Sequence, residues 1–240
     1  MMNICQTGDL LYGSRIARPK HNKLRPARKL YRAGIFFILC VTVRVSAPAQ
    51  SQTNSISLSE TNSLWRAGVG EGFRRGGYDL NVSGGAGFGV RMLGGKEFHD
   101  WWLTAAQFGY VLSDVVGKEH FYRGNFELLG QLFGGDQYHP DHAYFVGLGP
   151  MLRYDFATGT RVVPFFDISA GVAATDIRNG DLSSTFEFNL QAGVGAHVFL
   201  TDCFALTGQC RLIHMSDAGI TDPNNGVNNV TFLLGATWFF

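Results

Sequence analysis

The feature that most constrains this chain is a two-residue alternation of apolar and polar side chains, which begins near residue 79 and recurs to the C-terminus. In residues 186–200, every even position is apolar, whereas odd positions include Glu187, Asn189 and His197. Successive side chains of a strand point to opposite faces, so a period of two indicates strands with one apolar and one polar face. The pattern predicts a sheet with one face in an apolar environment.

Eight segments carry this alternation and are separated by turn residues. The chain has 31 Gly and only 7 Pro, which favours strands and turns over helices. Eight is the smallest number of strands in closed membrane barrels, whose interior is filled by side chains. We therefore predict an all-β fold, an eight-stranded antiparallel up-and-down transmembrane β-barrel over residues 79–240. Its expected strands are 79–92, 101–113, 120–133, 143–156, 164–176, 184–200, 203–215 and 229–240.

A soluble β-sandwich would also alternate, so other features must decide between the two folds. The polar face carries charges, which we expect to pair inside a narrow lumen. The apolar face carries aromatic residues near segment ends, as in the girdles of membrane barrels. The lumen charges are Glu127, Asp155, Asp167, Glu187 and Arg211, and the girdle candidates are Trp101, Trp102, Tyr110, Trp238 and Phe240.

The N-terminal part differs from the rest in charge. Residues 1–49 hold nine of the 20 basic residues and one of the 19 acidic residues. A basic run, the apolar stretch 33–43 and the small residues Ala47 and Ala49 predict an N-terminal extension followed by a cleaved signal peptide. An uncleaved anchor is the alternative, although the apolar stretch is too short to span a bilayer. Residues 50–240 keep 11 basic and 18 acidic residues, a net charge of about −7, which argues against nucleic acid as a partner.

Residues 50–78 form a lead-in segment between the signal and the barrel. Within it, residues 64–75 look strand-like and could be a ninth element, a periplasmic lead-in or part of the first hairpin. The chain ends on Phe240, which resembles the C-terminal signature of outer-membrane barrels read by their assembly machinery. We therefore expect the barrel-assembly machinery to be a partner.

One polar pair interrupts the apolar face near the end of the seventh segment. With periplasmic termini and an even strand number, the loop 216–228 lies outside the cell, and His214 and Ser216 point toward lipid there. Ionisable groups facing lipid are costly and usually functional. An imidazole two positions from a serine can take its hydroxyl proton during attack on a carbonyl. The alternative is two interfacial residues solvated at headgroup level.

The segment around this pair resembles the signature of the PagL-type lipid A 3-O-deacylases. The resemblance lies in residues 214–220, which read HMSDAGI, and in residues 223–228, which read PNNGVN. Residues 123–127 and 191–195 are similar, more loosely, to acyloxyacyl hydrolases. The resemblance implies an integral outer-membrane esterase of a Gram-negative cell. It would remove the 3-O-acyl chain of lipid A in the outer leaflet, without metal or cofactor, using Ser216 as nucleophile and His214 as general base.

The sequence departs from the family at two positions. Asn228 replaces the family's Glu; an amide can orient the imidazole but cannot stabilise its charge. Asp217 replaces an Asn, and either it or Asp222 could supply a charge instead. The oxyanion candidates are the backbone N–H groups of Ala218 and Gly219 with the side chain of Asn224, which also fits plain turn chemistry.

The sequence thus favours an outer-membrane lipid A deacylase, with lipopolysaccharide and outer-membrane lipids as its partners. The alternative from another class is a non-catalytic small barrel with a structural or adhesive role. The sequence leaves open the acyl position, the chain length and a homodimer. No metal-ligand spacing occurs among the other histidines of the predicted barrel, namely His99, His120, His139, His142 and His197.

Overall fold

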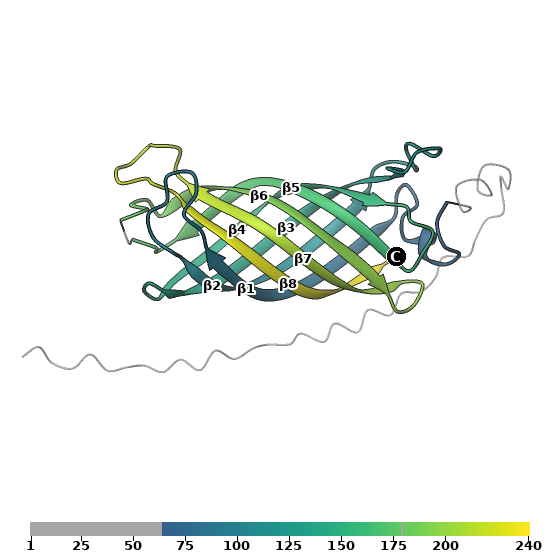
Figure 1. Ribbon diagram of the computed structural model, residues 1–240, viewed down its shortest axis with the longest axis horizontal. Helices are drawn as coiled ribbons and strands as arrows, with labels where there is room; N and C mark the ends of the chain where they lie inside the picture. Colours follow the sequence, from purple (N-terminus) through teal and green to yellow (C-terminus); the bar gives the residue numbers. More distant parts are fainter. Residues whose placement is uncertain (1–63, 179) are drawn as a thin grey trace, which may run out of the picture. The chain divides into compact units, whose positions relative to one another are not determined.

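The computed structural model describes residues 64–178 and 180–240. The predicted signal peptide and the first part of the lead-in segment lie outside these residues. The elements follow one another along the chain as a short 3-10 helix, η1, and eight strands (Figure 1). Their bounds are η1 Val69–Glu71, β1 Tyr78–Gly89, β2 Asp100–Val111, β3 Gly124–His139, β4 Ala143–Phe156, β5 Val162–Thr175, β6 Phe186–Phe199, β7 Phe204–Ser216 and β8 Val227–Phe239.

The eight strands form a closed barrel in which each strand pairs with its sequence neighbours, and β1 pairs antiparallel with β8 to close it. The predicted fold class is therefore confirmed. The largest difference in strand limits is at β3, which begins at Gly124 rather than at 120 and ends at His139 rather than at 133. Residues 117–123 form a turn instead, in which His120 N–H donates to Gly117 and Arg123 N–H donates to His120.

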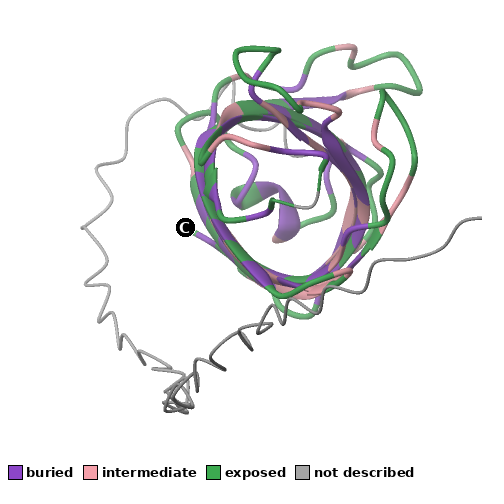
Figure 2. Cartoon of the chain, turned by 90° about the vertical axis from the view of Figure 1, so that its left-hand side faces the viewer, coloured by how far each residue is buried: buried purple, intermediate pink, exposed green. Residues whose placement is uncertain are grey.

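Exposure alternates along most of each strand, as the pattern of apolar and polar residues requires; residues 153–155 of β4 and 227–229 of β8 are exceptions, each with three buried residues in a row. In β6, Phe188 and Leu190 are exposed on the outer wall, whereas Glu187 and Asn189, which alternate with them, are buried in the lumen. Figure 2 shows this alternation of buried and exposed positions around the ring. The outer wall is therefore apolar, as in membrane barrels, whose outward-facing side chains contact lipid.

The middle of the lumen contains paired charges. Arg153 lies 3.4 Å from Glu127 and 3.5 Å from Asp167, and Arg211 lies 3.0 Å from Asp167. These residues are almost fully buried, so each charge depends on its partner for stabilisation. Asp155 and Glu187 are buried on the same face. The predicted lumen location of all five charged residues is confirmed.

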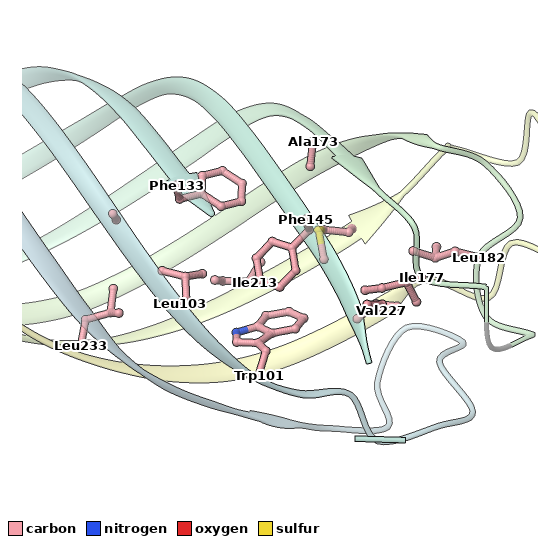
Figure 3. Close-up of a cluster of buried hydrophobic side chains, with 13 residues drawn as sticks. Trp101, Leu103, Phe133, Phe145, Ala173, Ile177, Leu182, Ile213, Val227 and Leu233 are labelled. Atoms are coloured by element: carbon pink, nitrogen blue, oxygen red, sulfur yellow. The ribbon is translucent and has the colours of Figure 1, made fainter. Parts of the chain in front are cut away.

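Apolar clusters fill the lumen on either side of this charged band. One cluster lies toward the end of the barrel that carries loops 90–99, 176–185 and 217–226, here called the long-loop end. Figure 3 shows its side chains, with Trp101 and Phe145 inside the barrel and Ile177, Leu182 and Val227 together near the loops. The predicted place of Trp101 in the outer aromatic girdle is therefore wrong, because the alternation of β2 turns Trp102 outward and Trp101 inward. The lumen is therefore packed and not an open pore.

The opposite end carries Phe240 and the segment 64–77, and is here called the terminal end (Figure 1). Trp65 stacks on Phe73 at 4.4 Å between ring centroids, and Phe73 contacts Phe239 at 5.0 Å. The strand-like stretch 64–75 forms no strand; it folds as turns and η1 against the aromatic cluster of this end. Within the described residues, no helix is long and apolar enough to cross a membrane.

Candidate active site

The candidate site lies where β7 ends and β8 begins, on the outer wall at the long-loop end. His214 and Ser216 are two positions apart on β7 and therefore share one face. The barrel register places Asn228 of β8 directly opposite His214. His214 and Ser216 are half-buried, whereas Asn228 is buried. The tertiary structure thus brings together the three residues that the resemblance assigns to catalysis.

A chain of hydrogen bonds joins the three side chains. His214 Nε2 lies 3.0 Å from Ser216 Oγ, and His214 Nδ1 lies 2.8 Å from Asn228 Oδ1. Asn228 Nδ2 donates to the backbone carbonyl of Met92 at 2.6 Å. Because the amide nitrogen is committed to Met92, the amide oxygen faces the imidazole and must accept a hydrogen bond from Nδ1–H. Nε2 is then the ring nitrogen that accepts from the serine hydroxyl.

An apolar groove of about 670 Å³ opens beside Ser216 on the outer wall. The register runs from Ser216 to Phe188 on β6, then to Val172 on β5 and to Leu148 on β4. Each step along this row lies farther from the long-loop end of its strand, so the groove descends from the barrel rim along the lipid-facing wall. Its lining is Leu148, Gly149, Pro150, Ala170, Gly171, Val172, Phe188, Leu190, His214, Ser216 and Ala218.

The loop after Ser216 is organised around the carboxylate of Asp217. It accepts hydrogen bonds from the Thr221 hydroxyl and from the backbone N–H groups of Gly219, Ile220 and Thr221. The Thr221 hydroxyl, together with these amides, holds the pKa of Asp217 below its usual value. The negative charge of Asp217 is therefore used within its own loop, while Asp222 is exposed.

The three oxyanion candidates occupy different positions in this loop. Ala218 has a positive φ of 59° and lines the groove next to Ser216. The N–H of Gly219 already donates to Asp217 at 3.0 Å. Asn224 Oδ1 accepts from the Asp217 N–H at 3.4 Å, which is the turn contact considered from the sequence. Of the three, only Ala218 lines the groove.

Two contributors to the site do not follow from the sequence pattern. The Met92 carbonyl belongs to the loop between β1 and β2, 136 positions from Asn228, so only folding brings them together. Gly226 has a φ of 77°, and a Cβ there would lie 2.7 Å from His214 Cε1. The turn sequence at 223–226 is consistent with a glycine of positive φ, but it does not predict the contact of that glycine with the imidazole.

Comparison with known proteins shows the family of the chain. The family model of the lipid A 3-O-deacylases (PagL) matches residues 83–237. The chain belongs to this family. The PagL lipid A deacylase of Pseudomonas aeruginosa is 32% identical over 100 residues, which cover 40% of this chain and 53% of that protein. The chain thus aligns with about half the length of this curated relative.

Two solved structures are similar to the chain. The outer-membrane enzyme PagL has 18% identity and a TM-score of 0.49, with 65% of this chain and 97% of that chain covered. Neisserial surface protein A has 16% identity and a TM-score of 0.50, with 69% and 99% covered. With its family and its apolar outer wall, the chain is an integral outer-membrane β-barrel. Within the described residues, no group of three or more His, Cys, Asp or Glu is placed to hold a metal ion.

Proposed function

We propose that this PagL-family barrel is a serine esterase that hydrolyses the ester-linked 3-O-acyl chain of lipid A in the outer leaflet. The observation that carries the proposal is the hydrogen-bond chain from Ser216 through His214 to Asn228, next to an apolar groove on the lipid-facing wall. Such a chain is the arrangement of nucleophile, general base and orienting group used for acyl transfer.

In the first half of the reaction, Ser216 Oγ attacks the ester carbonyl while His214 Nε2 takes the hydroxyl proton. The imidazolium that forms keeps its Nδ1–H on Asn228 Oδ1. Collapse of the tetrahedral intermediate breaks the ester C–O bond, and His214 returns the proton to the departing sugar oxygen. In the second half, water attacks the acyl-enzyme by the same route and releases the fatty acid.

The groove supports an acylated lipid as the substrate. It is almost entirely apolar, it begins at Ser216, and it continues down the wall toward the apolar interior of a membrane. An acyl chain lying in it would stay within a hydrocarbon environment while its ester carbonyl reaches the serine. The N–H of Ala218 is the oxyanion donor that we propose, because it borders the groove and the neighbouring Gly219 N–H is engaged by Asp217.

Asn228 gives the proposed enzyme an orienting group without a negative charge. An amide fixes the tautomer of the imidazole, which is the first part of the role of a carboxylate. It does not stabilise the imidazolium by charge, so we expect slower turnover than in a site built around a carboxylate. Neither Asp217 nor Asp222 serves as a substitute in this proposal, because Asp217 binds its own loop and Asp222 is exposed.

The test is mass spectrometry of lipid A from Gram-negative cells that express the wild type, Ser216→Ala or Ser184→Ala. Ser184 is the matched control, since its hydroxyl donates to the Phe186 carbonyl in a loop at the same end of the barrel. We expect loss of one 3-O-linked acyl group with the wild type and Ser184→Ala, and unchanged lipid A with Ser216→Ala.

Heat-modifiable migration on gels would verify that all three proteins are folded. Equal deacylation by folded Ser216→Ala would refute the serine mechanism. Unchanged lipid A in every strain would instead favour the alternative of a non-catalytic barrel.

A further inference from the structure

Asp181, in the loop between β5 and β6, is fully buried at the mouth of the barrel and is not part of the proposed chemistry. Its carboxylate accepts hydrogen bonds from Glu97 N–H at 2.9 Å, from Lys96 N–H at 3.1 Å and from His99 Nε2 at 3.1 Å. All three donors belong to loop 90–99. The side chain of Asp181 therefore fixes the position of that loop.

The backbone carbonyl of the same residue fixes a second loop. It accepts hydrogen bonds from Asn225 N–H at 2.9 Å and from Gly226 N–H at 3.3 Å. The Asn225 side chain adds a bond of 2.9 Å to the carbonyl of Gly180, next to Asp181. One buried residue thus connects loop 90–99 with the segment that leads into β8.

Both of these loops contact the active site. Loop 90–99 supplies the Met92 carbonyl that orients the amide of Asn228, and the other loop supplies Gly226 against the imidazole of His214. The two loops also approach each other closely, since a Cβ on Gly95 would lie 2.8 Å from the Gly226 carbonyl oxygen. Displacement of either loop would therefore disturb the orientation of Asn228 or His214.

The wall of the barrel holds this connection in place. His99 Nδ1 lies 2.8 Å from Gln137 Oε1 on β3, and Gln137 Nε2 donates to the Asp141 carbonyl at 2.9 Å. Leu182, beside Asp181, belongs to the same buried apolar cluster as Ile177 and Val227, and Figure 3 shows these three side chains together. Asp181 is consequently anchored by packing on one side and by His99 on the other.

We propose that Asp181 is a positioning residue for the active site. Through the two loops, it holds Asn228 in the orientation in which its amide oxygen faces His214. This inference rests on the proposed serine esterase function. The physical reason is that catalytic side chains need neighbours that fix their geometry, and a misplaced orienting group lowers the rate of the chemical step more than substrate binding.

The test is a double-mutant cycle of Asp181→Ala and Asn228→Ala, measured as kcat and KM for hydrolysis of a 3-hydroxyacyl ester by the full-length protein in detergent micelles. Asp181→Ala should lower kcat about tenfold, the size expected for a lost hydrogen bond to a charged group, with KM within about twofold. If Asp181 acts through Asn228, the double variant should be no slower than Asn228→Ala alone.

The matched control is Asp176→Ala. Asp176 lies in the same loop, but its carboxylate accepts from the Tyr144 N–H of β4 and contacts neither loop of the site. Its removal should leave kcat within about twofold of the wild type. Asp181→Asn, which keeps one acceptor oxygen, is the milder variant to use if the alanine variant does not fold.

Hydrogen exchange of residues 90–99 and 224–228 separates failure of this inference from failure of the function. Faster exchange of loop 90–99 in Asp181→Ala, and not in Asp176→Ala, supports the positioning role even if the wild type hydrolyses no ester. The backbone carbonyl of residue 181 remains in the variant, so residues 224–228 can respond only through their contact with loop 90–99. Additive losses of kcat in the double variant, or unchanged exchange of loop 90–99, would overturn the inference while leaving the serine mechanism intact.

Discussion

Replacement of Asn228 by Asp tests whether this site is built for an amide. The change exchanges an NH₂ group for an oxygen and keeps the shape of the side chain, so it isolates the bond of 2.6 Å to the Met92 carbonyl. Loss of that donor leaves a backbone acceptor unpaired, which costs about 2 kcal/mol. A carboxylate gains about 1 kcal/mol in its hydrogen bond to the imidazolium over a neutral amide.

The loss disfavours the orientation of the side chain that serves His214, and it exceeds the gain by about 1 kcal/mol. The population of that orientation, and with it kcat, therefore falls about fivefold, before repulsion between the new oxygen and the Met92 carbonyl is added. We expect kcat of Asn228→Asp to be lower than wild type, although the change introduces a negative charge beside His214. The assay is ester hydrolysis in micelles, with hydrogen exchange of loop 90–99 as a structural readout. A kcat above wild type, with loop 90–99 equally protected, would contradict the reasoning.

Three other predictions follow from the site and its groove. Gly226→Ala should lower kcat about tenfold or more, because its Cβ would lie 2.7 Å from His214 Cε1. The control is Gly219→Ala: Gly219 also has a positive φ, but nothing lies within 4 Å of a Cβ there, so kcat should be nearly unchanged in the same assay. Ala170→Phe should abolish hydrolysis of long acyl esters and spare short ones, since Ala170 lines the groove two strand spacings, about 10 Å, from His214. The control is Ala192→Phe, on the outer wall beyond the groove, which should spare both. The assay compares hydrolysis rates for esters of increasing acyl length. Protonation of Asp217, followed by the amide chemical shifts of its loop, should have a midpoint below about pH 3.9. The hydrogen bonds to the carboxylate therefore stabilise the loop at higher pH and are lost as pH falls through that midpoint. A midpoint at or above about pH 3.9 would show that Thr221 does not stabilise the carboxylate.

The sequence predicted much of the fold because one physical rule acts along the whole chain. Lipid outside and packed polar groups inside require a two-residue alternation, so the eight strands and the lumen location of Glu127 and Arg211 could be predicted without coordinates. The stretch 64–75 was ambiguous, because apolar residues that fold as turns against an aromatic cluster can give the same sequence pattern as a short strand.

The nucleophile and its base could also be predicted locally. His214 and Ser216 are two positions apart, and a strand brings such residues onto one face whatever the rest of the fold does. Placing Asn228 beside them required the assumption of a hairpin between the last two strands, and the register of β7 and β8 bears it out.

Only the tertiary structure decided how the amide of Asn228 is oriented. Its two partners, His214 and Met92, come from different strands and loops, and the Met92 carbonyl carries no sequence signal because every residue has one. The same holds for Asp181, whose contacts with Glu97 and Gly226 depend on three loops meeting over the closed end of a barrel. Alternation along a strand is a local property that the sequence determines, whereas the meeting of distant loops depends on barrel closure and on backbone groups that all sequences share.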